Sequence, residues 1–441
     1  MKILFIYHNI GTKNIRHFPY GIGTLSACLK EKGHETDLLY IQDAISEADL
    51  LAKVESFAPD LIGFSTVTLQ WQYTQNYARI IKSRFTTPII CGGPHATFIP
   101  EEVIAEPAVD LLCRGEGEYA LLELLRRMAS GGELSTIPNI WARNSQGLVI
   151  RNEIGPLVED LDSLPFPDRS IVPYDELLKE SKTEPVFITS RGCPYNCRFC
   201  SNSAIKKLYR GKGRYERQRS PENVIREIRQ LRAQFEFSTM NFYDEAFGVN
   251  KKWLQEFLEM YTAEFNYPFA CFIRAETMDQ ERFRMMKKAG LSLIYLGVES
   301  GNDEIRRKVM GRQVSNERII QACREAQAEG IQVWTFNIVG VPGETPQTID
   351  DTMELNRIIN PHFVSVSLYQ PFPFTGIYDD CVEQGLIKSS YATSLYDNSV
   401  LELPTISRED LSAKFHEFQE LSKEIRLRHE SKGERITLCD I

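Results

Sequence analysis

Short apolar runs alternate with amphipathic stretches along the first third of the chain. The runs predict five β-strands, at residues 3–7, 36–40, 61–65, 88–91 and 111–113. Between them, apolar residues recur at helical spacing over residues 23–32 and 73–85. Strands that alternate with helices are typical of a parallel sheet covered by helices on both faces. We therefore predict a doubly wound α/β domain over residues 1–140.

A second alternating series begins at residue 184. It predicts six strands, at residues 186–189, 239–243, 269–274, 293–298, 333–339 and 363–368. It also predicts helices between them, at residues 222–235, 252–261, 279–289 and 316–329. Six strands joined by crossover helices predict a partial (β/α)6 TIM-type barrel over residues 184–380, with its chemistry at the carboxyl ends of the strands.

Two other parts of the chain lack this alternation. Periodicity fades over residues 141–183, where Pro165 and Pro167 have acidic neighbours, so we predict a linker there. Residues 381–441 become irregular and then helical, most clearly at 410–428, and we predict a small, mostly helical C-terminal segment.

Composition excludes several classes of protein. The chain has 441 residues, of which 42% are hydrophobic and 25% charged, and no stretch has the apolar length of a membrane span. The first apolar run is too short for a secretory signal, so we expect a cytoplasmic protein. A net charge of -9 argues against nucleic-acid binding. One basic stretch, residues 206–219, is either a solvated surface or a docking site for an anionic substrate or an electron donor.

Three of the ten cysteines are closely spaced directly after the predicted strand at residues 186–189. Cys193, Cys197 and Cys200 have the spacing C-x3-C-x2-C, which lets one loop present three thiolates to one metal centre. Structural zinc normally takes four protein ligands, and no fourth Cys or His lies nearby. Three thiolates on a [4Fe-4S] cluster would instead leave one iron open to a small molecule.

This motif, with Phe199 before its last cysteine, resembles the signature of the radical S-adenosylmethionine (SAM) superfamily. The resemblance implies that the open iron binds SAM and that an electron from a flavodoxin- or ferredoxin-type donor cleaves it to a 5'-deoxyadenosyl radical. Further segments at the predicted strand ends resemble the superfamily's SAM contacts. They imply contacts from Asp244 and Glu245 to the ammonium group, Arg274 to a carboxylate, Glu299 to the ribose, and Val339 to the adenine. The two adjacent acids could also cap a helix, and Glu299 could belong to an ordinary turn.

The first domain resembles the Rossmann-like, B12-binding-type domain of the cobalamin-dependent subgroup. The resemblance rests on loops at the ends of the third, fourth and fifth strands, and it implies cobalamin contacts from Ser65, Thr66, Gly92, Gly93, His95, Glu116 and Gly117. The glycines could instead simply permit tight turns. No histidine has an Asp two positions before it, so the cobalt-binding pattern Asp-x-His-x-x-Gly is absent. Cobalamin would then lack a histidine lower ligand, unless His95 substitutes, or the domain has lost cobalamin and serves as a scaffold.

The resemblance implies an enzyme that methylates an unactivated carbon or a phosphorus centre of a small-molecule, lipid or natural-product substrate. Two alternatives keep the same scaffold: a reaction without methylation, such as cyclisation or rearrangement, and methylthiotransfer. The latter needs a second cluster, for which Cys28, Cys91 and Cys113 are the available thiols, although core packing also explains them. A corrinoid or redox sensor without catalysis is a further alternative.

Overall fold

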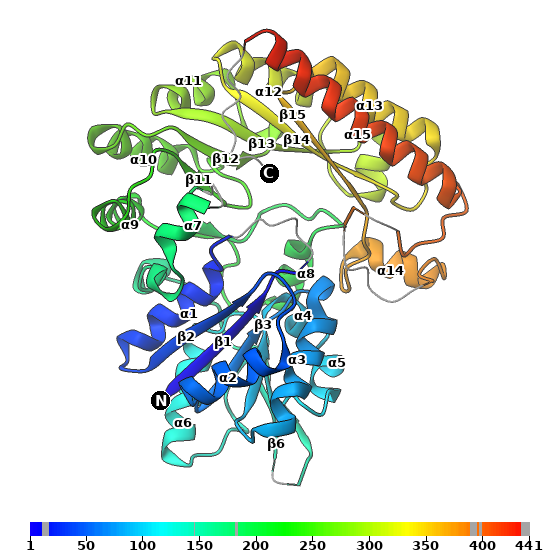
Figure 1. Cartoon of the computed structure of the whole chain (residues 1–441). Coiled ribbons are helices and arrows are strands. Elements are labelled where there is room, and N and C mark those ends of the chain that lie inside the picture. Colours follow the sequence, from blue (N-terminus) through cyan, green and yellow to red (C-terminus); the bar gives the residue numbers. More distant parts are fainter. Residues whose placement is uncertain (11–16, 145, 181–183, 389–394, 397–398, 434–441) are drawn as a thin grey trace. The chain divides into compact units, whose positions relative to one another are not determined.

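The computed structural model (Figure 1) describes residues 1–10, 17–144, 146–180, 184–388, 395–396 and 399–433. The chain forms two compact units. The first comprises residues 1–183 and 207–214, and the second comprises residues 184–206 and 215–441. Each unit is built on its own largely parallel sheet, which confirms the predicted α/β fold class. No described helix is long and apolar enough to cross a membrane.

The sheet of the first unit has the strand order β2-β1-β3-β4-β5-β6-β7. Its first five strands are parallel, and the last two are antiparallel additions at one edge. The strands are β1 (Lys2–His8), β2 (Glu35–Ile41), β3 (Leu61–Ser65), β4 (Ile89–Gly92), β5 (Leu111–Cys113), β6 (Ile140–Arg143) and β7 (Val149–Arg151). The five predicted strands are confirmed to within two residues at each end. The order changes direction at β1, as in doubly wound folds.

Helices α1 to α6 follow the parallel strands of this unit, and α7 comes in the segment after β7. They are α1 (Tyr20–Glu31), α2 (Glu47–Phe57), α3 (Trp71–Arg84), α4 (Gly93–Phe98), α5 (Pro100–Ala105), α6 (Glu118–Ser130) and α7 (Tyr174–Glu180). Helix α1 contacts α6, and α2 contacts α3. Because crossovers between parallel strands are right-handed, the change of direction at β1 places these two pairs on opposite faces of the sheet. The side chain of Ser46 accepts a hydrogen bond from the backbone N–H of Asp49 and so caps α2.

The second unit contains six parallel strands in the order β15-β14-β13-β12-β11-β8. They are β8 (Val186–Phe187), β11 (Met240–Phe242), β12 (Phe269–Ile273), β13 (Leu291–Glu299), β14 (Gln332–Val339) and β15 (Phe363–Leu368). A separate two-stranded ribbon pairs β9 (Ser190–Arg191) with β10 (Arg217–Gln218). Among the described strands, β8 and β15 form the open edges of the large sheet. This arrangement matches the predicted partial barrel.

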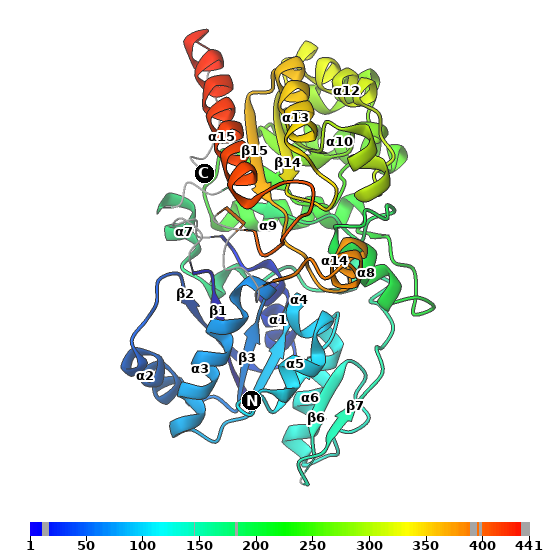
Figure 2. The same ribbon diagram turned by 90° about the vertical axis from the view of Figure 1, so that its right-hand side faces the viewer.

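Helices α9 to α13 form a layer outside the sheet of the second unit (Figure 1), and α10, α12 and α13 are also seen together in Figure 2. Each contacts the next in the series α9, α10, α11, α12 and α13. The helices are α8 (Ser201–Leu208), α9 (Pro221–Gln234), α10 (Lys251–Glu264), α11 (Gln280–Lys288), α12 (Asn316–Ala328), α13 (Pro346–Ile359), α14 (Gly376–Glu383) and α15 (Arg408–Ser431). The long α15 packs along β15 and α13 and buries Phe415 and Phe418. It therefore covers an edge of the sheet that would otherwise be exposed.

The predicted linker differs from what the structure shows. Residues 140–143 and 149–151 form β6 and β7, so the predicted boundary after residue 140 falls inside a strand. These strands have four and three residues, too few to show an alternating pattern, and they form because β5 offers a free edge. Three residues of the linker's end, 181–183, lie outside the described part of the chain.

Candidate functional site

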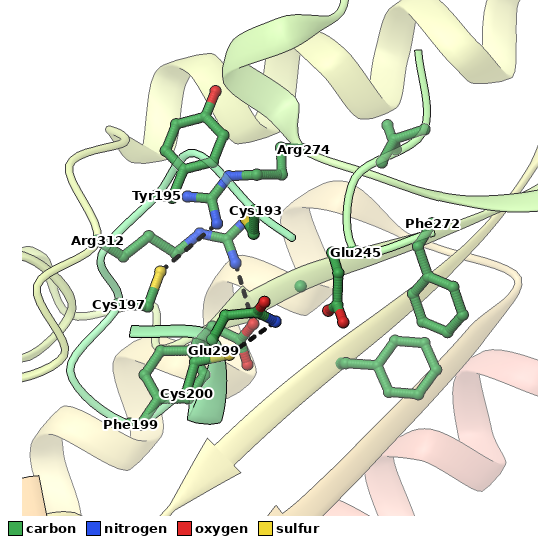
Figure 3. Close-up of a pocket in the computed structure, with 14 residues that line it drawn as sticks. Cys193, Tyr195, Cys197, Phe199, Cys200, Glu245, Phe272, Arg274, Glu299 and Arg312 are labelled. Carbon is green, nitrogen blue, oxygen red and sulfur yellow. Dashed lines mark hydrogen bonds and ion pairs between the residues drawn. The ribbon is translucent and has the colours of Figure 1, made fainter. Parts of the chain in front are cut away.

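One pocket of the second unit brings together most residues that the motif analysis selected. Its cavity is about 170 Å³, and its walls come from the cysteine loop and from the carboxyl ends of β12, β13 and β14 (Figure 3). The lining residues are Cys193, Tyr195, Cys197, Phe199, Cys200, Asn202, Glu245, Phe272, Ile273, Arg274, Gly297, Glu299, Arg312 and Phe336. The carboxyl ends of parallel strands are where barrel enzymes build their sites.

All three predicted cysteines line this cavity. Cys193 and Cys197 are buried, and Cys200 is half-buried just before α8 begins. The backbone N–H of Arg198 donates to the carbonyl of Met310 at 2.8 Å and ties the loop to the segment after β13. No set of three His, Cys, Asp or Glu side chains in the described residues surrounds a single metal-ion position. A four-iron cube binds each thiolate through a different iron, so three thiolates on one loop can hold three corners of a cube.

The two adjacent acids after β11 have different surroundings. The Asp244 carboxylate is buried away from the pocket and accepts hydrogen bonds from Thr189, through its backbone N–H at 3.1 Å and its hydroxyl at 2.8 Å. It also accepts one from the hydroxyl of Ser190. Glu245 lines the pocket, where burial raises the pKa of its carboxyl and a hydrogen bond from Asn202 opposes that rise. Asp244 therefore holds the start of the cysteine loop, and Glu245 is the acid that a ligand can reach.

Glu299 ends β13 in a strained conformation. Its φ is +67°, and the pairing register between β13 and β14 shifts beside it. Its Oε1 accepts a hydrogen bond from Arg312 Nη1 at 3.0 Å, and both side chains are buried. A Cβ added to Gly297 would lie 2.2 Å from Glu299 Oε1 and 2.8 Å from Arg312 Nη1, so only glycine leaves room for the pair. Strain of this kind is typical of functional sites.

Arg312 lines the pocket but was not predicted from the sequence. Its Nε and Nη2 are buried, and in the described part of the chain they have no hydrogen-bond partner. Buried N–H groups of a guanidinium normally have acceptors, because leaving them unpaired is costly. The open donors therefore favour an anionic ligand in the cavity. No sequence pattern pointed to Arg312, because it lies 13 positions after Glu299 and joins it only in the fold.

Arg274 was predicted to face a carboxylate, but each of its three guanidinium nitrogens donates a hydrogen bond to another protein group. Its Nη1 donates to Cys197 Sγ at 3.5 Å, and its Nε donates to Glu276 Oε1 at 2.9 Å. Its guanidinium also lies over the Tyr195 ring, 3.7 Å from the ring centroid. Arg274 thus lines the pocket as predicted, but its donors are directed at the protein.

Val339 does not line the pocket. Its side chain is fully buried in the core beside β15, and its carbonyl accepts a hydrogen bond from the backbone N–H of Tyr369 at 2.8 Å. The nearby Glu344 is also fully buried, and its Oε2 accepts a hydrogen bond from the backbone N–H of Val341 at 3.1 Å. Its Oε1 has no partner within the described residues, and burial raises the pKa of this carboxyl to about 8.

The raised pKa of Glu344 gives the protein a pH-dependent stability. Glutamate in the unfolded chain titrates near pH 4.3, so between about pH 4.3 and 8 the unfolded state releases a proton that the folded state keeps. Stability contributed by this group therefore falls as pH rises through that window. We expect Glu344→Gln, which stays neutral, to gain about 2 kcal/mol or more over the wild type between pH 5 and pH 8.5. Thermal unfolding at both pH values measures this gain, and parallel pH profiles would contradict it.

The first-unit residues chosen for cobalamin lie together at the carboxyl ends of β3 and β4. Ser65 pairs in register with Gly92, and the N–H of Thr66 donates to the Gly92 carbonyl at 3.0 Å. Gly93 has a φ of +88°, and a Cβ there would lie 2.8 Å from the Thr66 carbonyl oxygen. At Gly92 an added Cβ would make ordinary van der Waals contacts, the nearest at 3.9 Å. The strand pairing and the hydrogen bond therefore bring these loop residues together, and Thr66 itself is buried.

His95 lies inside the first unit. Its side chain is fully buried, its ring centroid lies 4.8 Å from that of Trp71, and its Nδ1 is 3.3 Å from the hydroxyl of Thr68. Burial lowers the pKa of His95 to about 4. His8, at the end of β1, is also buried, with its Nε2 2.7 Å from the hydroxyl of Thr74. The structure therefore does not support His95 as a cobalt ligand.

Glu116 forms hydrogen bonds within the first unit, and Gly117 lies next to it in the chain. Glu116 Oε2 accepts a hydrogen bond from the N–H of Val158 at 2.8 Å, and the N–H of Glu116 lies 2.8 Å from the hydroxyl of Tyr209. Gly117 directly precedes α6. The Glu116 side chain therefore holds the segment after β7 in place.

The three other candidate cysteines occupy separate packing environments. Cys28 packs against Val158, Leu161 and Leu164, whereas Cys91 is buried in the core around β4. Cys113 ends β5 beside Gly117. A tenth cysteine, Cys439, lies outside the described residues.

Two family models match the chain. Residues 187–355 match the radical SAM superfamily model, and residues 10–125 match the B12 binding domain model. The chain belongs to the radical SAM enzymes that carry a B12-binding domain. Together the two matched regions span more than half of the chain and confirm the resemblance found in the motifs.

Relatives of this B12-binding radical SAM enzyme include proteins of different named activities. An uncharacterized methyltransferase of Pyrococcus horikoshii is 26% identical over 374 residues, covering 84% of this chain and 79% of the relative. The anaerobic magnesium-protoporphyrin IX monomethyl ester cyclase of Rubrivivax gelatinosus is 26% identical over 399 residues, covering 86% and 70%. The fold is similar to that of the radical SAM methyltransferase TsrM from Kitasatospora setae, solved with tryptophan and a SAM analog. That match has a TM-score of 0.73 and 18% identity and covers 87% of this chain and 76% of TsrM.

Proposed function

We propose that this enzyme binds a [4Fe-4S] cluster, SAM and cobalamin, and methylates a carbon or phosphorus centre of a small-molecule, lipid or natural-product substrate. The observation that carries the proposal is the single cavity that Cys193, Cys197 and Cys200 share with Glu245 and Arg312, in a chain that also has a B12-binding domain. A second structure of TsrM contains cobalamin and a [4Fe-4S] cluster, which supports the same cofactor set.

The three cysteines would hold three irons of the cluster and leave the fourth open. When bound, these groups supply an electron that breaks a carbon–sulfur bond of SAM, and a cobalt centre that carries a methyl group. Aromatic side chains line the same cavity, among them Phe199, Phe272 and Phe336. Apolar walls exclude water, which protects a reactive carbon radical from side reactions.

Two opposite charges in the cavity match the amino acid end of SAM. The Glu245 carboxylate would accept hydrogen bonds from the ammonium group, and the unpaired Nε and Nη2 of Arg312 would donate to the carboxylate. Arg312 suits the carboxylate better than Arg274 does, because the donors of Arg274 already reach Glu276 and Cys197. Glu299 would keep Arg312 in place through the bond at 3.0 Å.

We also propose a flavodoxin- or ferredoxin-type protein as the electron source. The basic stretch that suggested a docking site is not uniform. Lys206 pairs with Glu216 at 2.8 Å, and Arg219 is buried beside Glu227. The cations that remain exposed are Lys207, Arg210 and Arg214.

The proposal can be tested before the substrate is known. Anaerobically reconstituted protein is given hydroxocobalamin, a strong reductant and SAM with an isotopically labelled methyl group. We expect about four irons per chain, an absorption band of bound cobalamin, release of 5'-deoxyadenosine, and labelled methyl on the recovered cobalamin. Protein that binds the cluster but no cobalamin would contradict the proposal and favour a first domain that serves only as a scaffold.

A reaction without methylation is the second candidate, because the cyclase of Rubrivivax gelatinosus matches 86% of this chain with the same identity as the methyltransferase relative. The same experiment separates the two. Bound cobalamin together with 5'-deoxyadenosine, but without label on cobalamin, would favour cyclisation or rearrangement. Once a substrate is found, product mass decides, since methylation adds one methyl group and consumes two SAM molecules.

A further inference from the structure

We propose that the ion pair of Arg274 and Glu276 sets the reduction potential of the cluster through the Cys197 thiolate. The inference rests on the proposed function, because it requires a cluster on the three cysteines. Arg274 Nη1 donates to Cys197 Sγ at 3.5 Å, and both side chains are buried. Hydrogen bonds to the cysteine sulfurs are among the features that set the potentials of iron–sulfur clusters.

Contacts with Glu276 and Tyr195 hold the Arg274 guanidinium in an orientation in which Nη1 points at Cys197 Sγ. Its Nε and Nη2 both donate to Glu276 Oε1, the first of them at 2.9 Å. The face of the guanidinium lies over the Tyr195 ring, 3.7 Å from the centroid. Tyr195 itself lies between Cys193 and Cys197 in the loop, so the stacking ties the cation to the loop that would hold the cluster. The planar guanidinium cannot turn without breaking the stack and the ion pair.

Cys197 differs from the other two cysteines in the charge of its donor. Cys193 accepts a hydrogen bond from the backbone N–H of Tyr195, and Cys200 accepts one from Asn202 Nδ2 at 3.8 Å. Both of those donors are neutral, whereas the donor to Cys197 is a cation. Reducing the cluster adds one negative charge, and a buried cation at the sulfur stabilises that charge with little screening. Arg274 therefore raises the potential and makes the cluster easier to reduce.

Glu276 opposes this effect. Its carboxylate is largely shielded from solvent beside the guanidinium and offsets part of the positive charge. The cluster must also stay a strong enough reductant to cleave a sulfonium, so a bare cation at Cys197 would cost driving force. The ion pair therefore sets a reduction potential that allows the cluster to be reduced and still leaves it able to reduce a sulfonium. This role differs from the contact to a ligand carboxylate that the sequence motif suggested for Arg274.

The test is a redox titration of the reconstituted protein, followed by electron paramagnetic resonance of the reduced cluster. We expect Arg274→Gln to lower the equilibrium constant for one-electron reduction at least tenfold, about 59 mV. Glu276→Gln should raise the same constant by a similar factor, because it leaves the cation uncompensated. Arg274→Lys keeps the charge, so its potential should lie between those of Arg274→Gln and the wild type.

The control is Arg219→Gln. Arg219 also forms a buried ion pair, with Glu227, but it does not line the cavity of the three cysteines. The Arg219→Gln variant should be less stable than the wild type, but the reduction potential of its cluster should be unchanged. An unchanged potential in Arg274→Gln at full iron loading would overturn the inference and leave the proposed function intact. If Arg274→Gln binds no iron, the reduction potential of Glu276→Gln decides. A potential that is unchanged or lower than that of the wild type would overturn the inference. A wild-type protein that binds no cluster would instead overturn the proposed function.

Discussion

Cys197→Ala is expected to abolish formation of 5'-deoxyadenosine, with a loss of at least about 1,000-fold, because SAM then has no source of the electron that cleaves it. The Cys197 side chain is buried, lines the cavity and has the only cationic hydrogen-bond donor among the three cysteines as the structure describes them. Iron content and the absorption of the cluster should fall together with activity. Both are measured after anaerobic reconstitution.

Cys323→Ala is the matched control. Cys323 is also fully buried, but it lies in α12 and does not line the cavity. This variant should keep its iron and its activity, with only the small loss of stability expected for removing one buried sulfur. A Cys197→Ala protein with wild-type iron content and full SAM cleavage would contradict the proposed cluster site.

Arg312→Met is expected to affect both SAM binding and stability. Removing the guanidinium takes away the two donors that we propose for the SAM carboxylate, and each bond to a charged group contributes about 1.5–3 kcal/mol. The Kd for SAM should rise by roughly 100-fold or more. The Glu299 carboxylate also loses its partner at 3.0 Å while buried, which should cost about 3–5 kcal/mol of folding free energy. Calorimetric titration of the reconstituted, unreduced protein measures binding, and thermal unfolding measures stability.

The double variant Arg312→Met/Glu299→Gln separates these two effects. Neutralising Glu299 removes the uncompensated buried charge, so most of the lost stability should return. SAM binding should stay weak, because the donors to its carboxylate are still absent. Recovery of tight SAM binding in the double variant would show that Arg312 only balances Glu299, and would contradict its role as a ligand contact.

The main strands of the fold were predictable, because alternating strands and crossover helices leave a pattern in the sequence. All five parallel strands of the first sheet and all six of the second coincide with predicted apolar runs. The pair β6 and β7 was missed because a short edge strand depends on pairing with a neighbour rather than on its own periodicity. The same holds for the ribbon of β9 and β10, each of two residues.

The site was predictable only in part. Local spacing identified the three cysteines and Phe199, because one loop presents them together. Glu245, Arg274 and Glu299, which resemblance selected as SAM contacts, line the same pocket. It could not show that Asp244 turns away from the cavity, because neighbouring residues at the end of a strand face opposite sides. Nor could it show that Val339 and His95 are buried in the cores of their units.

Arg312 could not be predicted from the sequence, because only the fold brings it to the cavity. After Glu299 the chain makes a π-helical turn, η5 (Ile305–Val309), in which Arg306 is fully buried. Arg306 donates to the carbonyls of Ser300 at 2.7 Å and Val314 at 2.8 Å. These bonds join the residue after Glu299 to the segment that follows Arg312, and so return Arg312 to the cavity. Turns of this kind often occur at functional sites.

The sequence by itself determined the layout of strands and helices and the loop of three thiolates, because hydrophobic periodicity and close spacing act over a few residues. The tertiary structure decided the charge pattern of the cavity: which acid reaches it, which arginine keeps open donors, and which sulfur receives a cation. Those features depend on contacts between residues far apart in the chain, such as Arg274 with Cys197 and Arg312 with Glu299. Such contacts form only when the strands place their ends side by side, and no local pattern encodes them.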